Sequence, residues 1–598
     1  MEILKEAFGN NDEQICCASW VEGPLMVLAG PGVGKTRVLT HRIGYLLRLY
    51  PNDVFRVLAL TFTNKAADEM KERLKFLLND EFIVSKLLVS TFHAFGFEIL
   101  KQHYETVGRK KNFSIIDEED KCEILQHEVG CERKNLSKIF NGIIYIKQNL
   151  KSAEEIDDPY LAKIFVKYEE VLKRLNAFDL DDLIYQPVKM FIRNPQILAT
   201  YRERFKWILI DEYQDINFAQ YQMIKMLAHE ENSNLCVIGD PDQAIYGWRG
   251  ADVKFIREFV RDFPSASIYR LKKSYRCCDN ILRASEGVIG VKKGFLEGLQ
   301  KGVKIKIIEN STDRSEAEFI ARTIEKMMGG LRFFSIDSAI TQGNEIPEVK
   351  SLSEFAVLCR IKSQMNAIEK AFNDHSIPYQ KIDIYPFFRQ EPVKSVIDVL
   401  KFLRNPENNF LKKRLNEKGI FLRILKNSEN KTVKEKISLI IDRFFPGNRN
   451  DECMKDLVEL AQDFGDNFDE FLKFVSLGSG LDTYRPDVER VALMTLHSAK
   501  GLEFECVFIS GCEDGLLPYS LFDGQISDRD EERRLLYVGM TRAKSFLFLT
   551  HAKRRFIFGK QLHLKPSPFL ESIKKELIEF SSANKQRKKK EDPQLRLL

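Results

Sequence analysis

Residues that could hold a phosphate group lie close together near the start of the chain. Gly30, Gly32 and Gly34 alternate with other residues and are followed directly by Lys35 and Thr36. The backbone N–H groups of such a loop can point at one anion, and the dipole of a following helix adds to the attraction. A lysine can then reach the β- and γ-phosphates of ATP, and a threonine hydroxyl can hold Mg²⁺. This spacing predicts a nucleotide site, with an ordinary turn as the plainer alternative.

A strand must precede this loop and a helix must follow it. Leu25 to Ala29 form an apolar run of strand length, and the apolar residues after Thr36 recur at helical spacing. The usual pattern begins with a glycine, and in this chain Ala29 occupies that first position. Upstream, Gln14 carries an amide that offers a donor and an acceptor to the edge of an adenine ring. A polar surface residue is the plainer alternative for Gln14.

Two adjacent carboxylates follow a later apolar run. Asp211 and Glu212 come directly after Trp207 to Ile210, which has the composition of a buried strand. Paired carboxylates are costly in a core and useful beside a metal ion. We expect Asp211 to hold Mg²⁺ and Glu212 to orient and deprotonate the attacking water. A lone acidic pair after an apolar run is common, so this prediction depends on the glycine loop.

Aromatic rings mixed with polar donors and cations suit single-stranded nucleic acid, whose bases stack on such rings. Phe62 precedes Asn64 and Lys65, although a phenylalanine at a strand end is more often core. The cluster Thr91, Phe92 and His93 is similar, and its histidine alone would be read as structural. A later glycine-flanked loop contains Gln243, which could sense the γ-phosphate, and two rings that could face bases. Those two rings belong to Tyr246 and Trp248.

Length and composition limit the other possibilities. A chain of 598 residues is too long for one core and should divide into several domains. With 92 Lys and Arg against 87 Asp and Glu, the net charge of +5 does not by itself indicate a nucleic-acid partner. We find no apolar run long enough for a bilayer and no signal peptide, so we expect a cytoplasmic protein without a membrane partner. The 11 cysteines include no CxxC spacing, which argues against a metal cluster.

Several longer segments carry a family resemblance. They read NNDEQ, AGPGVGKTR, LTFTNKAADEM, STFHAFG, LIDEYQD, VIGDPDQAIYGWRGAD, LKKSYR, MTLHSAKGLEF and EERRLLYVGMTRAK. They occur in one order between Asn11 and Lys544. The chain resembles the superfamily 1 DNA helicases of the UvrD/Rep/PcrA type, and a complete set of these segments is far more specific than any one of them.

The resemblance assigns further roles. Arg276 and Arg542 are similar to the arginines that reach the γ-phosphate, Tyr275 to a residue that stacks on adenine, and Glu503 to one that contacts the nucleotide. The implied catalytic residues are Lys35, Asp211, Glu212, Gln243, Arg276 and Arg542. The implied ATP-binding residues are Gln14, Ala29, Gly30, Pro31, Gly32, Val33, Gly34, Lys35, Thr36, Arg37, Tyr275 and Glu503, with Thr36 and Asp211 at the metal. The implied DNA-binding residues are Phe62, Asn64, Lys65, Thr91, Phe92, His93, Tyr246, Trp248, Thr495, His497, Ser498 and Lys500.

The fold class implied is α/β, with two RecA-like P-loop NTPase domains that are each interrupted by a mainly helical insertion. We expect the first domain at 1–90 and 201–276, its insertion at 91–200, the second domain at 277–380 and 484–575, a reduced second insertion at 381–483, and a disordered basic tail at 576–598. The second insertion looks shorter than is usual in the family. The segment 333–349 looks like an added loop of unassigned role, and we expect no accessory module at the C-terminal end.

Three hypotheses about activity stay open at this point. The first is a 3′–5′ helicase that binds single-stranded DNA and its junctions with duplex, as a monomer or weakly self-associating. The second is a translocase that unwinds poorly because its second insertion is short. The third is a DNA-binding scaffold without catalysis, against which Lys35, Glu212, Gln243 and Arg542 argue. The cellular pathway, with repair, replication or recombination as the candidates, and the protein partners are not predicted.

Overall fold

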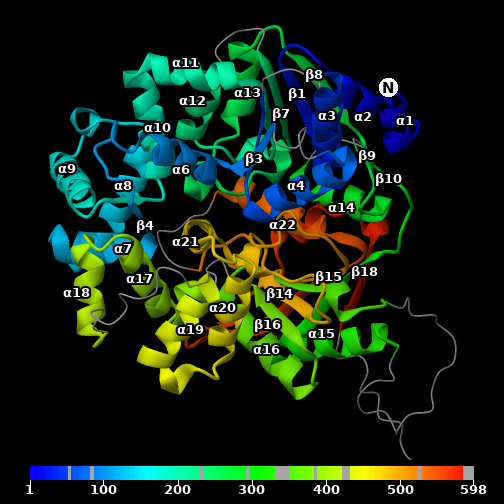
Figure 1. Ribbon diagram of the computed structural model, residues 1–598. Coiled ribbons are helices and arrows are strands. Elements are labelled where there is room, and N and C mark those ends of the chain that lie inside the picture. The colour runs from blue at the N-terminus through cyan, green and yellow to red at the C-terminus, as the bar shows by residue number, and fades with distance from the viewer. Residues whose placement is uncertain are drawn as a thin grey trace, which may run out of the picture.

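The computed structural model describes residues 1–50, 56–80, 86–228, 233–290, 296–329, 349–382, 387–420, 431–521 and 528–582 (Figure 1). The predicted added loop at 333–349 lies outside these ranges except for Val349, and so does the basic run at 585–590. Two parallel sheets form the centres of two α/β bodies, and helical segments inserted into each sheet lie beside one another.

The first sheet contains six of the described strands, and neighbouring strands are parallel in the order β3-β2-β6-β7-β1-β8. Its strands are almost continuously apolar because helices cover both faces. The carboxyl ends of parallel strands share one edge, so the glycine loop after β1 and the acidic pair after β6 meet there. The strands are β1 (Leu25–Ala29), β2 (Arg56–Thr61), β3 (Leu87–Thr91), β6 (Phe205–Ile210), β7 (Asn234–Gly239) and β8 (Ser267–Leu271). The helices around them are α1 (Glu2–Phe8), α2 (Asp12–Ser19), α3 (Lys35–Leu49), α4 (Asn64–Leu78), α12 (Phe218–Leu227) and α13 (Lys254–Asp262).

The first insertion follows β3 and is mainly helical. A buried ion cluster stabilises it, in which Lys147 Nζ lies 3.0 Å from Asp179 and 2.8 Å from Asp182. Its helices are α6 (Phe92–His103), α7 (Glu118–Glu123), α8 (Leu136–Gln148), α9 (Pro159–Arg174), α10 (Asp182–Arg193) and α11 (Pro195–Arg204), with the short parallel strands β4 (Ser114–Ile116) and β5 (Ala177–Asp179). Part of this segment is not separate from the first sheet, because α6 and α10 contribute to the same hydrophobic core as β6 and β7.

The second sheet has the strand order β13-β14-β12-β15-β16-β11-β18 among the described residues, with β17 antiparallel to β16. Its strands are β11 (Ile305–Thr312), β12 (Phe355–Cys359), β13 (Tyr379–Ile382), β14 (Val491–Thr495), β15 (Phe504–Ser510), β16 (Ala543–Ile557), β17 (Lys560–His563) and β18 (Ile578–Ser582). Its helices are α14 (Asp279–Ile289), α15 (Asp313–Met327), α16 (Met365–Asp374) and α22 (Arg529–Met540).

The predicted disordered tail at 576–598 starts too early. Residues 578–582 form β18, which pairs in parallel with β11 from Ile305 to Glu309. The pairing satisfies backbone hydrogen bonds at the edge of the sheet, and Ile578 is buried against the core. The lysines near this segment favoured the prediction of a disordered tail, and the prediction overlooked that Ile578 could be buried at a sheet edge. Residues 583–598 lie outside the described ranges.

The second insertion lies between β13 and β14. Its described helices are α17 (Val393–Arg404), α18 (Asn409–Glu417), α19 (Val433–Phe444), α20 (Glu452–Gln462) and α21 (Phe468–Leu477). They surround a hydrophobic core of their own, which includes Val396, Ile437 and Phe471. Residues 421–430 of this insertion lie outside the described ranges.

The two insertions are joined by buried charges (Figure 1, α7 beside α17 and α18). The guanidinium of Arg414 lies 2.6 Å from Asp120 and 2.9 Å from Glu123, both on α7, and 2.9 Å from Asp398 on its own insertion. The amide of Asn405 donates to Ser114 Oγ at 3.0 Å. These contacts fix α17 and α18 on the surface of the first insertion.

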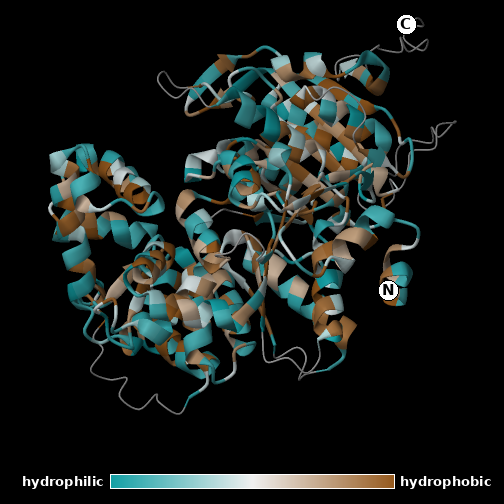
Figure 2. Ribbon diagram, turned by 90° about the horizontal axis from the view of Figure 1, so that it is seen from above, coloured by the Kyte–Doolittle hydropathy of each residue, from teal (hydrophilic) through white to brown (hydrophobic). Residues whose placement is uncertain are grey.

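Most helices carry hydrophobic and hydrophilic residues together, as amphipathic helices packed on a buried core must (Figure 2). In α3, for example, Val38, Leu39 and Ile43 are buried while His41 stays partly accessible. Among the described residues, no helix combines the length and the apolar character needed to cross a bilayer.

Candidate functional site

The glycine loop has the backbone that the sequence predicts for a phosphate cradle. Gly32 and Gly34 have φ values of +71° and +83°, a conformation that favours glycine. A side chain at Gly32 would also collide with Arg276. The loop leads from β1 into α3, so Lys35 and Thr36 begin the helix.

Side chains from two other segments hold this loop in place. Gln14 is buried and donates from Nε2 to the carbonyl of Val33 at 2.7 Å. Ser274 Oγ donates to the carbonyl of Pro31 at 3.0 Å, and the backbone N–H of Tyr275 donates to Gly32 at 2.8 Å. Gln14 therefore supports the loop backbone, a contact that the sequence prediction of an adenine partner did not include.

The acidic pair lies at the end of β6, next to the loop. Lys35 Nζ is 3.8 Å from Glu212 Oε1. Burial, and then the charge of Glu212, raises the pKa of Asp211 to about 7. Burial alone would raise the pKa of Glu212 also, but the attraction of Lys35 and then of Lys500 lowers it to about 2. Glu212 is thus ionised near neutral pH.

Glu212 also has an unusual backbone. Its φ of +50° and ψ of +45° place a residue with a side chain in the left-handed region. Strained positions of this kind persist where surrounding contacts hold them, and they are enriched at functional sites. The contacts here include Gln214, whose Nε2 donates to the Glu212 carboxylate and whose Oε1 accepts from Asp240 N at 2.9 Å. Gln214 and Asp240 lie in the segments LIDEYQD and VIGDPDQAIYGWRGAD, and neither residue had a predicted role.

Arg542 comes to this edge from the second sheet, at the end of α22. It is fully buried, and its Nη2 donates to Gln243 Oε1 at 3.2 Å. Gln243 in turn donates from Nε2 to Asp240 Oδ2 at 2.6 Å. Burial, and then the nearby charge of Arg276, lowers the pKa of Arg542 to about 9. The structure therefore brings Gln243 and Arg542 together across the two sheets.

Arg276 and Glu503 also meet. Arg276 Nε lies 2.7 Å from Glu503 Oε2, and Lys544 Nζ lies 3.1 Å from Glu503 Oε1. Both carboxylate oxygens of Glu503 therefore have cationic partners. The ring of Tyr275 is 42% exposed, and its hydroxyl accepts from Asn11 Nδ2 at 2.9 Å. The ammonium of Lys273 lies 5.7 Å from the centroid of this exposed ring, which stands beside the glycine loop.

Arg37 does not face the loop. Its Nη2 donates to the carbonyl of Ala7 at 2.5 Å, and its guanidinium lies over the ring of Phe8. The prediction that Arg37 binds ATP is therefore not supported by its position. As the third residue of α3 it points back to α1.

The predicted DNA-binding rings form one cluster, but only part of it is accessible. Phe62 and Tyr246 stack on each other with ring centroids 4.8 Å apart. Tyr246 is buried, with 8% of its surface exposed, whereas Trp248 is 57% exposed. His497 lies edge-on to Trp248 at 6.1 Å. Trp248 is therefore the most accessible of these rings, with the guanidinium of Arg249 4.6 Å from its centroid, while Tyr246 packs against Phe62.

Five predicted DNA contacts of the first domain lie in different environments. Phe92 is 3% exposed and belongs to the hydrophobic core, so the prediction of a DNA-stacking ring is wrong for this residue. The cause is the amphipathic face of α6, which packs against the sheet. Thr91 caps α6 by accepting from Ala94 N at 3.2 Å. His93 is half-buried beside it, and Asn64 and Lys65 begin α4.

The predicted DNA-binding loop of the second domain is largely closed on itself. Thr495 Oγ1 and Ser498 Oγ lie 2.9 Å apart, and both residues are buried. Lys500 is buried too, and its Nζ pairs with Asp215 and donates to the carbonyl of Gln243 at 2.6 Å. The position of Lys500 contradicts a direct DNA contact and makes it a link between the two sheets. Asp215, the last residue of the DEYQD segment, is the partner that the sequence analysis missed.

A histidine of this loop keeps a partly accessible position. Burial, and then the charges of Arg360 and Arg249, lower the pKa of His497 to about 3. Its imidazole is therefore neutral near neutral pH. Tyr246 OH donates to its carbonyl at 3.4 Å, so the rings of the first domain and this loop are in direct contact.

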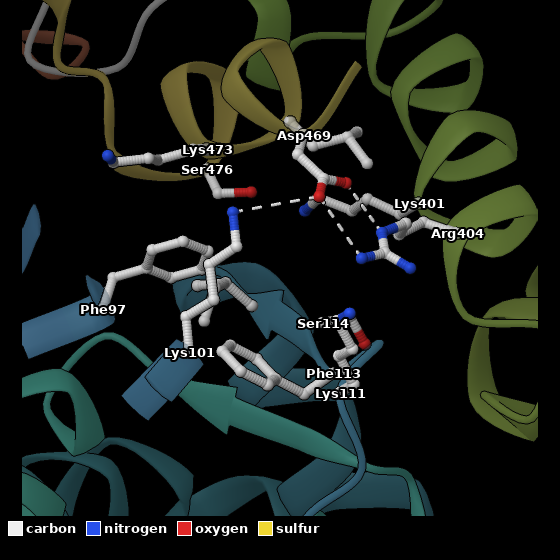
Figure 3. Close-up of a pocket in the computed structure, with 12 residues that line it drawn as sticks. Phe97, Lys101, Lys111, Phe113, Ser114, Lys401, Arg404, Asp469, Lys473 and Ser476 are labelled. Atoms are coloured by element: carbon white, nitrogen blue, oxygen red, sulfur yellow. Dashed lines mark hydrogen bonds and ion pairs between the residues drawn. The ribbon is translucent and has the colours of Figure 1, made fainter. Parts of the chain in front are cut away.

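A cavity between the two insertions lies apart from these residues (Figure 3). Its cations are largely paired: Arg404 Nε lies 2.7 Å from Asp469 Oδ1, and Lys101 Nζ lies 3.9 Å from Asp469 Oδ2. Lys473, which also lines the cavity, lies 2.7 Å from Glu98. The described lining includes none of the predicted ATP- or DNA-binding residues.

The class of P-loop NTPases with two RecA-like domains is defined by two parallel sheets, a glycine loop between β1 and a helix, an acidic pair after β6 at the same sheet edge, and an arginine supplied by the second domain. The model of the UvrD/REP helicase N-terminal domain matches residues 10–264. The model of the UvrD-like helicase C-terminal domain matches residues 269–445 and 449–554. The chain belongs to the UvrD/Rep family of DNA helicases.

Named relatives agree with the family. The ATP-dependent DNA helicase PcrA of Staphylococcus aureus is 33% identical over 659 aligned positions, which cover 96% of this chain and 87% of the relative. The protein of the same name in Staphylococcus epidermidis is 32% identical, over 96% of this chain and 88% of the relative. Because the alignment is longer than the 598 residues of this chain, the relatives carry residues that this chain lacks.

Proposed function

We propose that this protein hydrolyses ATP to move 3′ to 5′ along single-stranded DNA and to separate duplex strands. The observation that carries the proposal is the hydrogen bond between Arg542 and Gln243, because it joins the residues predicted to sense the γ-phosphate across the two sheets. Closing and opening of the two sheets on a nucleotide would change this contact. Such a change is what a motor needs in order to convert hydrolysis into movement.

Each group at the sheet edge has a chemical role in this proposal. The loop backbone and Lys35 bind the phosphates, and Glu212, ionised and held by Gln214, orients and deprotonates water. Arg276 and Arg542 stabilise the charge that develops on the γ-phosphate. The hydroxyl of Thr36 and the carboxylate of Asp211 are oxygen donors of the kind that Mg²⁺ prefers, so these residues fit that ion. When bound, Mg²⁺ would neutralise phosphate charge.

On the DNA side, Trp248 provides the accessible stacking surface, with His497 and Tyr246 beside it and Phe62 stacked on Tyr246. Stacking on aromatic rings is tolerant of sequence, as movement along any strand requires. The contact between Tyr246 and the carbonyl of His497 connects the ring cluster to the second domain. A strand bound here would therefore touch groups from both sheets.

A translocase that unwinds poorly is the second candidate, and the length of the alignment favours it. The relatives contain residues that this chain lacks, and a reduced second insertion is what the sequence predicts. A smaller insertion offers less surface for duplex. In this candidate the ATPase is intact and strand separation is weak.

Strand displacement on duplexes with a 3′ or a 5′ tail, with ATPase followed in the same tube, tests the proposal. Unwinding of the 3′-tailed duplex alone would support the helicase and its polarity. ATP turnover without strand separation would select the translocase, and no turnover in the presence of DNA would leave only a binding scaffold. Lys35→Ala is the control, because it should abolish turnover while nucleotide-free DNA binding persists.

A further inference from the structure

The segment that leads back from the second insertion to the second sheet contacts two predicted DNA-binding residues, Asn64 and Lys65. This segment, residues 477–484, is called the return segment here, and it follows the end of α21. It contacts the start of α4, where Asn64 and Lys65 form the first turn. The two regions are more than 400 residues apart in the sequence, as the separation of Asn64 and Asp482 shows.

The contact is made by the carboxylate of Asp482. Its Oδ1 accepts from the backbone N–H of Lys65 at 3.2 Å, and its Oδ2 accepts from Asn64 Nδ2 at 3.2 Å. Ser479 orients the same carboxylate, donating to Oδ2 from its backbone N–H at 2.7 Å and from its hydroxyl at 3.0 Å. The ammonium of Lys65 lies 4.4 Å from the ring centroid of Tyr484. The return segment thus engages the amide, the backbone N–H and the cation of this turn.

The groups that hold Asp482 are those that a DNA phosphate would use. A backbone N–H in the first turn of a helix, a side-chain amide and a lysine all favour an anion. A carboxylate and a phosphate present the same kind of acceptor oxygens, and two anions cannot share these donors without strong repulsion. We propose that Asp482 competes with a backbone phosphate of single-stranded DNA for Asn64 and Lys65, so that the return segment restrains DNA binding until a strand displaces it.

The return segment is held at this place by contacts on its insertion side. Lys473, near the end of α21, lies 2.7 Å from Glu98 on α6, and Asp469 on the same helix pairs with Arg404 (Figure 3). Arg389 Nη2 lies 3.5 Å from the carbonyl of Ser476. Displacing Asp482 would therefore also disturb contacts of the second insertion. DNA binding at the start of α4 would in this way be coupled to the position of that insertion.

This inference rests on the proposed DNA-binding role of Asn64 and Lys65. It predicts that Asp482→Asn, which removes the charge and keeps the shape, binds a fluorescent oligothymidine about three- to tenfold more tightly without nucleotide at low salt. The gain should disappear when Lys65→Ala is added. Asp487→Asn is the matched control, because it removes the same charge from an exposed carboxylate that pairs with Arg485. Its affinity should stay at the wild-type value.

Ser479→Ala gives a second test that changes no charge. It removes one donor to Asp482, so oligothymidine binding should tighten by a smaller factor than in Asp482→Asn. Melting curves of each variant show that it is folded.

The outcomes separate this inference from the proposed function. Unchanged or weaker binding by Asp482→Asn, in a protein that Lys65→Ala weakens, would overturn the competition and leave the DNA site standing. No effect of Lys65→Ala in either background would overturn both the site and the inference. Tighter binding by Asp482→Asn in a protein that fails to displace strands would uphold the competition and contradict only the helicase activity.

Discussion

Arg542 of the second domain donates from Nη2 to Oε1 of Gln243, in the loop after β7 of the first domain, at 3.2 Å. The other hydrogen bonds of this buried guanidinium go to the carbonyls of Val538 and Leu502 and to the Thr541 hydroxyl. Neutral acceptors orient the group without cancelling its charge. Burial lowers the pKa of Arg542 to about 9, because the charged form lacks water. An oriented cation of this kind is suited to a triphosphate between the two domains.

Replacing Arg542 by alanine should reduce the ATP turnover number by roughly 10³-fold, because a positioned arginine stabilises charge mainly in the transition state. The KM for ATP should change much less. Steady-state kinetics with saturating single-stranded DNA measure both quantities. Arg554→Ala is the control, since Arg554 is an exposed arginine on β16. A folded Arg542→Ala protein that keeps its turnover number would contradict the assignment.

Replacing Trp248 by alanine should weaken binding to single-stranded DNA by about 1–3 kcal/mol, the usual contribution of one stacked base. Its ring is 57% exposed beside His497, and the guanidinium of Arg249 lies 4.6 Å from the ring centroid. Fluorescence anisotropy at matched salt gives the affinity, and ATPase titrations with DNA give the stimulation. Tyr246→Phe is a useful comparison, because it keeps the buried ring and removes only the bond to the carbonyl of His497. Unchanged affinity in Trp248→Ala would return this ring to a structural role.

The strands of both sheets were predictable because their signals are local. Leu25–Ala29 is an apolar run whose observed strand has the predicted bounds, and the predicted run Trp207–Ile210 lies within the observed strand Phe205–Ile210. Ile578–Ser582 was missed because a single edge strand with charged neighbours becomes stable only through pairing with β11. Local composition cannot show which sheet edge a segment will find.

The site was predictable only in part, for the same physical reason. The glycine loop and acidic pair have motifs, but burial decides what a side chain can touch. Phe92 and Lys500 lie in segments with polar residues. In the fold, however, Phe92 packs in the hydrophobic core and Lys500 pairs with Asp215. The contact of Asp482 with Lys65 joins segments that are distant in the sequence, so no local pattern could predict it.

Replacing Arg555 by methionine should lower the free energy of unfolding by about 3–5 kcal/mol, because it leaves two buried carboxylates without their cation. The Arg555 guanidinium lies 2.5 Å from both Glu316 and Glu513, and all three side chains are buried. Chemical denaturation measures the change. The neighbouring Arg554 points to solvent on the same strand, so Arg554→Met should change stability by less than about 0.5 kcal/mol. Equal effects at the two positions would show that the buried ion cluster contributes little.

The stability contributed by His375 should depend on pH. Its Nε2 lies 3.1 Å from Glu318 and its Nδ1 lies 3.0 Å from Glu325, so the imidazolium donates to both carboxylates. Burial is the largest single effect and opposes the charge, but the bonds to the two carboxylates and their charges together outweigh it and raise the pKa of His375 above its ordinary value of 6.5. A pKa that is higher in the folded state gives stability that is fully present below pH 6.5 and lost as the pH rises through the folded value.

His375→Gln should therefore cost about 0.5 kcal/mol at pH 5.5, as expected for an ion pair partly open to water, and less at pH 8.5. Thermal melts of the variant and wild type at both pH values measure the difference. The difference in stability between variant and wild type cancels the effect of other histidines. One of these is His551, whose pKa is lowered by burial. A difference that is the same at both pH values would mean that His375 contributes through packing, while a larger cost at pH 8.5 would contradict the raised pKa.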